Sequence, residues 1–190
     1  MSWDLDIKNT IEKAGGYVGE DVFIGKYCIF TAPSLIRLQN RVRIDPFCLI
    51  TVNLTVSSNC QICSHSVIGG GSKHKVNLGE FCFIGYGSKL FCGSEDYSGE
   101  YGPVNDFWGK NKVFSGDITF KDFSGIASDV IIMPGVTLPE GCTIGAKSFV
   151  YKNPSDPWTI YLGNPLREHK VRNRDQILAL SKDPSYIKSH

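Results

Sequence analysis

The sequence predicts an all-β protein, a parallel β-helix in which three short strands make each coil and about six coils stack. Two regularities predict this fold. An apolar residue recurs every six positions, and the residue four places later is usually small. This period fits neither an amphipathic helix nor the alternation of a half-buried strand. The apolar positions are Val18, Ile24, Phe30, Leu38, Ile44, Ile50, Val56, Ile62, Ile68, Leu78, Ile84, Leu90, Phe120, Ile126, Ile132, Leu138, Ile144 and Val150.

The small positions, where each corner of a coil bends, account for most of the seven cysteines. A buried free cysteine behaves as a small hydrophobic residue. Cys60 and Cys63 have the spacing of a metal-binding or redox pair, but a structural zinc site needs a second pair that the sequence lacks. We therefore predict a structural role for the corner cysteines and no metal site. These cysteines are Cys28, Cys48, Cys60, Cys82 and Cys142.

Both ends of the chain depart from the repeat. Residues 3–14 predict a short helix that ends at Gly15-Gly16. Residues 173–182 predict a second one, after a proline-rich stretch at 154–158. We expect an N-terminal helical cap over 1–16, the β-helix over 17–154 and a C-terminal segment with its helix over 155–190.

A long excursion over residues 91–117 interrupts the β-helix. An insertion of this length is usually functional, so we expect it to shape a substrate site. The alternative is a surface extension that packs on a neighbouring subunit. Its acidic and aromatic residues include Glu95, Asp96, Tyr97, Tyr101 and Trp108.

Composition excludes several classes of protein. The 190 residues carry 20 basic and 19 acidic side chains, a net charge of +1 that argues against nucleic-acid binding. Hydrophobic residues make up 42% and charged residues 21%, which excludes a disordered chain, and no apolar run is long enough to span a membrane. The N-terminus is acidic and amphipathic, unlike a secretory signal, so we expect a cytoplasmic protein.

Three motifs in the C-terminal half carry a family resemblance. They are IMPGVT at 132–137, IGAKSFV at 144–150 and GNPLR at 163–167, and they follow the hexad array in that order. Residues 16–172 resemble the hexapeptide-repeat acyltransferases. Within that family the likeness is to N-acyltransferases of nucleotide-linked 4-amino sugars, including the anthrose N-acyltransferase type, which share the EDYSG run at 95–99 and WTIYLG at 158–163.

The resemblance implies a left-handed β-helix that forms a homotrimer with active sites between subunits. It also implies acetyl-CoA or another acyl-CoA as donor, a nucleotide-linked amino sugar as acceptor, and a role in surface polysaccharide such as lipopolysaccharide O-antigen. Independently, Arg167, Lys170 and Arg172 form a basic cluster beyond the last coil that suits the phosphates of CoA. The CoA contacts implied by the resemblance are Ser128, Ala146, Tyr151, Lys152, Arg167 and Lys170.

The sequence departs from the family's O-acetylating members at the catalytic base. Those enzymes carry a histidine five residues past a hexad's apolar position, and the corresponding residue here is Glu95. A neutral amine is already a good nucleophile and needs no histidine. We expect Glu95 or Asp96 to hold the acceptor ammonium and relay its proton, with substrate contacts from Ser88, Tyr97 and His74.

Other functions stay open at this point. An O-acetyltransferase of a sugar or xenobiotic hydroxyl could use His74 from a neighbouring subunit. A metal-dependent carbonic anhydrase needs three histidines on facing coils, and only His65 lies on a hexad. A covalent route through Cys92 lacks a histidine beside the thiol. A non-catalytic scaffold is the remaining alternative.

Overall fold

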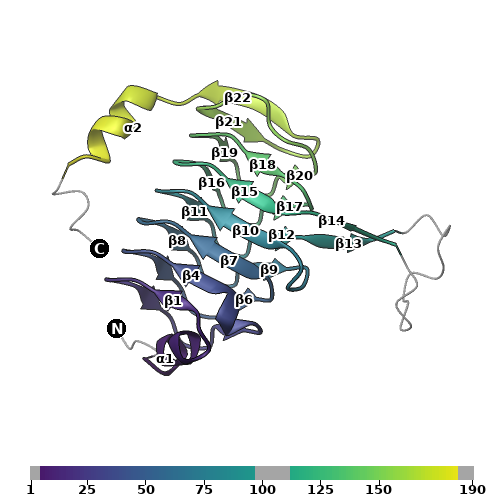
Figure 1. Cartoon of the computed structure of the whole chain (residues 1–190). Helices are drawn as coiled ribbons and strands as arrows, with labels where there is room; N and C mark the ends of the chain where they lie inside the picture. The colour runs from purple at the N-terminus through teal and green to yellow at the C-terminus, as the bar shows by residue number, and fades with distance from the viewer. Residues whose placement is uncertain (1–4, 97–111, 184–190) are drawn as a thin grey trace.

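The chain winds through three parallel β-sheets that form the faces of a prism, as the computed structural model shows for residues 5–96 and 112–183 (Figure 1). Except for one antiparallel pair at the C-terminal end, each strand of these sheets pairs with the equivalent strand of the next coil, so every face is a ladder that runs along the prism. The predicted fold class, a left-handed parallel β-helix of about six coils, is confirmed.

The three faces are named here by the order in which the chain meets them. The first face contains β1 (Tyr17–Val18), β4 (Ile36–Leu38), β7 (Asn53–Val56), β10 (Lys75–Leu78), β15 (Ile118–Phe120) and β18 (Thr137–Leu138). The second contains β2 (Phe23–Ile24), β5 (Arg43–Ile44), β8 (Gln61–Ile62), β11 (Phe83–Ile84), β16 (Gly125–Ile126), β19 (Thr143–Ile144), β21 (Thr159–Leu162) and β22 (Arg167–Val171). The third contains β3 (Ile29–Phe30), β6 (Leu49–Ile50), β9 (Val67–Gly69), β12 (Lys89–Phe91), β17 (Ile131–Ile132) and β20 (Phe149–Val150).

The apolar hexad positions fill the interior of the prism. All of them are buried except Phe30, which is partly buried and packs against the core at the N-terminal end. The five corner cysteines are buried free thiols, as predicted, and the Cys60 thiol donates to the carbonyl oxygen of Gly79 at 3.0 Å. Cys63 and Cys92, outside the repeat, are buried as well.

The corners that join the faces differ from one another. We call the bend from first to second face the first corner, from second to third the second corner, and from third to first the third corner. At the first two, residues with φ near +60°, such as Arg41 at the first corner and Phe47 at the second, keep the turns tight and alike. The third corner carries the insertions: the 3₁₀ turn Pro33–Leu35, the loop at 70–74 and the long excursion.

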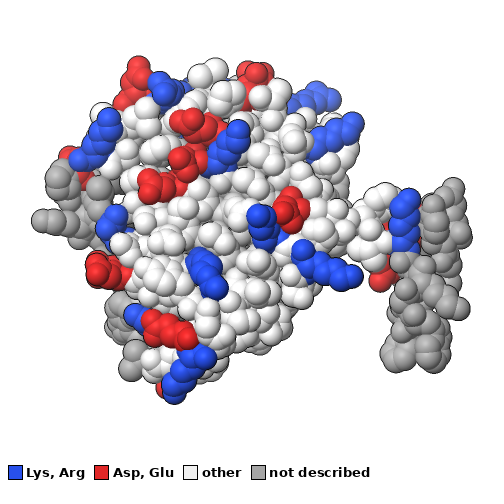
Figure 2. All heavy atoms as spheres, viewed as in Figure 1, with Lys and Arg blue, Asp and Glu red and all other residues white. Residues whose placement is uncertain are grey.

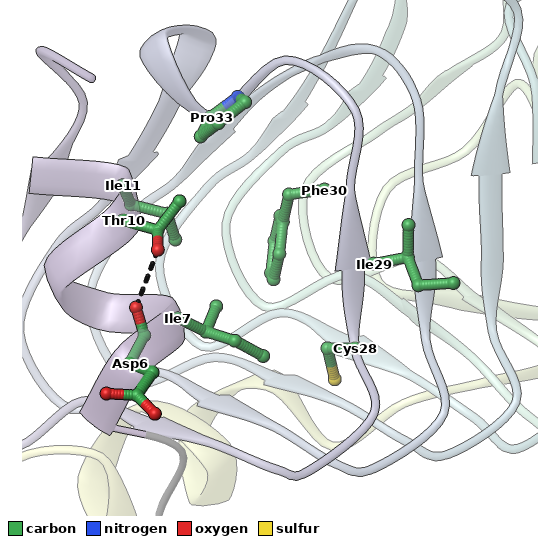
Figure 3. Close-up of a pocket in the computed structure, with 8 residues that line it drawn as sticks. All are labelled: Asp6, Ile7, Thr10, Ile11, Cys28, Ile29, Phe30 and Pro33. Atoms are coloured by element: carbon green, nitrogen blue, oxygen red, sulfur yellow. Dashed lines mark hydrogen bonds between the residues drawn. The ribbon is translucent and has the colours of Figure 1, made fainter. Parts of the chain in front are cut away.

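Helices close both ends of the chain. α1 (Leu5–Lys13) buries Ile11 completely and leaves a cavity of about 420 Å³ against the first coil (Figure 3). α2 (Arg174–Leu180) begins after Asn173, whose Oδ1 accepts the N–H of Gln176 at 3.2 Å. Both predicted helices are therefore present, each shorter than expected. No helix in the described ranges is long and apolar enough to cross a membrane.

Candidate active site

The excursion begins as a two-stranded hairpin, which differs from the plain loop that the sequence predicts. β13 (Gly93–Glu95) pairs antiparallel with β14 (Val113–Ser115), and the hairpin projects away from the third corner (Figure 1). Glu95 is half-buried on β13. The N–H of Asp96 donates to the carbonyl oxygen of Lys112 at 2.9 Å, which extends the ladder by one residue. Tyr97 lies outside the described residues.

His74 lies at the base of this hairpin, on the loop before β10. Its Nδ1 is 3.2 Å from Oδ1 of Asp117, and the N–H of Lys75 donates to the same oxygen at 3.1 Å. Asp117 directly precedes β15, where the chain re-enters the coil. The pair therefore ties the preceding coil to the end of the excursion. Its role in substrate binding stays a prediction.

Three predicted site residues lie at the second corner, across the third face from the hairpin. Ser88 is completely buried: its hydroxyl donates to the carbonyl oxygen of Ala127 at 2.9 Å and accepts from the N–H of Val130 at 3.2 Å. Ser128 is half-buried one coil higher, and Ala146 is exposed on the next coil. One chain therefore keeps its hairpin carboxylates and these residues at different corners.

The remaining predicted CoA contacts lie over the last coil. Tyr151 and Lys152 follow β20, and the Lys152 ammonium lies 5.3 Å from the Tyr151 ring centroid. Arg167 and Lys170 are exposed on β22, which pairs antiparallel with β21 at the end of the second face. These side chains can supply three cations and an aromatic surface to a polyanionic ligand.

Arg172 does not belong to this exposed cluster, which corrects the sequence-based prediction. Its guanidinium is half-buried and donates to the carbonyl oxygens of Phe123 at 2.8 Å and Gly141 at 2.6 Å. It also lies 5.9 Å from the Trp158 ring. Burial lowers the pKa of Arg172 from its usual value. Arg172 therefore fastens the C-terminal segment to the first corner instead of facing a ligand.

Cys92 lacks the environment of a nucleophile. The thiol is completely buried at the start of the hairpin, 3.8 Å from the carbonyl oxygen of Lys75. Burial raises its pKa to about 11, so it is protonated at neutral pH. A protonated, buried thiol does not suit covalent catalysis, so direct transfer to the acceptor is the remaining route.

Sequence reasoning missed a row of residues along the second corner. Each lies three places after an apolar residue of the second face, and that spacing was the available signal. The row consists of Tyr27, Phe47, His65, Gly87, Asp129 and Lys147.

Among the described residues, acidic and basic side chains are interspersed on the face that Figure 2 shows. No large patch of one charge sign is visible on that face. Within residues 5–96 and 112–183, no group of three or more His, Cys, Asp or Glu side chains could hold a metal ion.

Known proteins resemble this chain over most of its length. A dTDP-4-amino-4,6-dideoxy-D-glucose acyltransferase from Escherichia coli is 30% identical over 162 residues, 83% of this chain and 82% of that protein. AntD, an N-acyltransferase from Bacillus cereus, superposes with a TM-score of 0.82 at 29% identity, over 92% of this chain and 94% of that one. That crystal structure contains dTDP-4-amino-4,6-dideoxyglucose and coenzyme A. A chloramphenicol acetyltransferase from Agrobacterium fabrum is 27% identical over 130 residues, 62% of each chain. No protein-family model matches the sequence.

Stacked hexads, a single long excursion and an exposed basic cluster over the last coil define a hexapeptide-repeat protein of the transferase class. The similarity to the Escherichia coli enzyme is decisive about the family. The chain belongs to the hexapeptide-repeat acyltransferases and is an enzyme, as the sequence motifs predict.

Proposed function

We propose that the protein is an acyl-CoA-dependent N-acyltransferase, most simply an N-acetyltransferase, that acts on the amino group of a nucleotide-linked amino sugar. The observation that carries this proposal is the match over 92% of the chain to an N-acyltransferase crystallised with such a sugar and coenzyme A. The alternative, transfer to a hydroxyl, is not favoured, because relatives of that type cover less of the chain.

The residues of the hairpin suit transfer to an amine. The neutral amine attacks the thioester carbonyl carbon, the carbon–sulfur bond breaks, and the amine proton passes to the departing thiolate or a carboxylate. Glu95 or Asp96 holds the acceptor as an ammonium ion, takes up the proton that this ion loses to become the attacking neutral amine, and relays it. No histidine has to act as the base, and none stands at position 95.

The donor is expected over the C-terminal coils. Arg167 and Lys170 are exposed there on β22, Tyr151 and Lys152 follow β20, and cations are what the phosphates of CoA require. Ser128 and Ala146 continue this surface down the second corner, towards the coil where an acceptor has to meet the thioester.

A homotrimer would bring the separated parts of the site together. The hairpin carboxylates leave the third corner, whereas Ser128 and Ala146 lie at the second, so a neighbouring copy has to supply one of the two groups. The outer row of the third face, which joins these corners, is apolar at every position but one. It consists of Ile29, Leu49, Val67, Lys89, Ile131 and Phe149. We propose this row as the subunit interface.

The cellular role follows from the proposed substrates. Acyl-CoA and nucleotide-linked sugars are cytoplasmic metabolites, so we expect the enzyme in the cytoplasm. Acylated amino sugars are building blocks of bacterial surface polysaccharides, and we propose O-antigen or a similar polymer as the destination of the product.

Calorimetric titration of CoA and acetyl-CoA into the purified protein tests the donor. We expect about one site per subunit, with affinity reduced on the order of tenfold by Arg167→Ala because a cation–phosphate contact is lost. Arg41→Ala, at the first corner of an early coil, is the matched control and should bind normally. A protein that binds neither ligand would overturn the transferase proposal.

A further inference from the structure

Two aromatic ladders follow the corners of the prism, and the chain covers one of them. At the first corner Phe81 stacks on Phe123 with ring centroids 5.0 Å apart, and Trp158 follows. Ile177 and Leu180 of α2 face the two phenylalanines across a cavity of about 230 Å³. The C-terminal segment therefore covers the aromatic ladder of the first corner.

The second ladder, at the second corner, stays exposed. Tyr27 stacks on Phe47, and Phe47 on His65, each pair with centroids 5.2 Å apart. The exposed fraction is 68% for Tyr27 and 51% for Phe47, and His65 is exposed as well. Because these rings stack face to face from coil to coil, a ligand can reach their edges and the outer ring face at each end of the stack, and an apolar face of a ligand can lie on such an end face.

The second ladder ends abruptly at a glycine. The N–H of Gly87 donates to the carbonyl oxygen of Ser64 at 3.1 Å, which puts Gly87 one coil above His65. Where a side chain would continue the ladder there is none. We call the space between the His65 ring, Gly87 and the Asp129 side chain of the next coil the Gly87 slot.

Two charges border the Gly87 slot. A Cβ atom on Gly87 would lie 2.6 Å from Oδ1 of Asp129, so the carboxylate points directly into the slot. The Lys89 ammonium donates to the carbonyl oxygen of Gly87 at 3.1 Å. Over the described ranges, the Asp129 carboxylate makes no hydrogen bond or ion pair with another residue. The slot thus offers an acceptor and a donor beside an aromatic floor.

Neighbouring hydroxyl groups on a sugar ring match this arrangement. One hydroxyl can donate to a carboxylate while the next accepts from an ammonium, and the C–H face of the ring can lie on an aromatic surface. We propose that the Gly87 slot is a carbohydrate subsite that receives the sugar ring of the acceptor, with Asp129 and Lys89 binding its hydroxyls. This inference rests on the proposed function.

The position of the slot favours the sugar over the nucleotide base. Asp129 directly follows Ser128, a proposed CoA contact, so the slot adjoins the donor surface. The reacting amine is carried on the sugar ring, whereas the base lies beyond a diphosphate and a ribose. The ring in this slot is therefore the one whose amine has to reach the thioester, and the proposed role of the hairpin carboxylates in holding that amine is unchanged.

The test compares Asp129→Asn and Gly87→Asn with Asp21→Asn. Asp21 is a matched control, because it occupies the same left-handed corner conformation at the first corner of the first coil. Asparagine tolerates this conformation, so all three variants should fold. The assays are the acceptor KM for dTDP-4-amino-4,6-dideoxy-D-glucose at saturating acetyl-CoA, calorimetric binding of dTDP alone and of CoA alone, and sedimentation.

We expect Asp129→Asn to raise the acceptor KM on the order of tenfold, because a hydrogen bond to a charged group is lost. Gly87→Asn fills the slot and should raise it further. Affinity for dTDP and for CoA, and the subunit assembly, should match the Asp21→Asn control.

An active wild type with an unchanged acceptor KM in both slot variants would overturn the carbohydrate subsite alone. Weaker binding of dTDP in Asp129→Asn would overturn it too, because the slot would then hold the base. A wild-type protein that neither binds CoA nor acylates the amino sugar would overturn the proposed function, and the subsite with it.

Discussion

The first and third faces of the prism have the same interior and opposite exteriors. Inward, both present branched or aromatic apolar residues in every coil, such as Leu78 on the first face and Leu90 on the third, and both of these are buried. Four strands of the first face, β4, β7, β10 and β15, bury a second apolar residue as well. Outward, the third face carries the apolar row proposed as the interface. The outer row of the first face is mostly polar: Tyr17, Arg37, Thr55, Asn77, Thr119 and Thr137.

The difference teaches where the hexapeptide repeat carries information about function. The inward rows meet one requirement, dense packing of each coil on the next, and so they are alike on every face. The outward rows are free of that requirement. The outward row of the third face is apolar where that of the first face is polar. This difference indicates that the third face packs against a partner surface.

The comparison is tested most severely by charges on the third face. Leu49→Glu with Ile131→Glu should convert the proposed trimer to a single 21.0 kDa chain and remove most transferase activity. A buried carboxylate without a partner costs about 3 kcal/mol or more. Analytical ultracentrifugation measures the mass. The same charges on the first face, Thr55→Glu with Thr119→Glu, are the control and should leave assembly intact. If the variant with Leu49→Glu and Ile131→Glu is still a trimer, the interface lies elsewhere.

The hairpin sharpens the comparison, because we propose that its carboxylates act in the chemistry and not in packing. Glu95→Gln with Asp96→Asn should lower kcat roughly 100-fold, since groups that transfer protons contribute about that much. Affinity for CoA and sedimentation should not change. Steady-state kinetics with saturating acetyl-CoA measure the effect, and an unchanged kcat would remove both carboxylates from the mechanism.

A substitution of Arg172 tests a contact that we expect to stabilise the fold. Arg172→Gln should lower the free energy of unfolding by about 2 kcal/mol, because two partly buried, charge-assisted hydrogen bonds to carbonyl oxygens are lost. Urea denaturation measures the change. Arg174→Gln is the matched control, because Arg174 also lies over the Trp158 ring, at 5.7 Å, but makes neither of these hydrogen bonds. Its ion pair with Asp175 is exposed and 3.9 Å long, so the substitution should cost much less.

Cys92 should give the smallest effect. Cys92→Ala should cost about 1 kcal/mol of stability for the small cavity and leave kcat unchanged. Because burial raises the thiol pKa to about 11, iodoacetamide should react slowly at pH 8 and faster only as the pH approaches that value. Lost turnover in Cys92→Ala, with normal folding, would restore the covalent route.

Much of the fold could be predicted because the repeat is local and redundant. Each hexad places its apolar residue inward for the same steric reason, so one irregular position such as Phe30 does not disturb the pattern. The site could be predicted less well. The basic residues past the last coil look alike in sequence, but Arg172 turns inward to Phe123 and Gly141, contacts that span 49 and 31 residues.

The sequence by itself determined the coil, the buried role of the corner cysteines and the acyltransferase family, because periodic packing and short motifs are properties of neighbouring residues. Only the tertiary structure decided what lies along a corner. Residues 65, 87 and 129 are about one coil apart in space but far apart in the chain, because each coil returns the backbone to the same corner. The exposed ladder, the gap at Gly87 and the carboxylate of Asp129 therefore meet only when the coils stack.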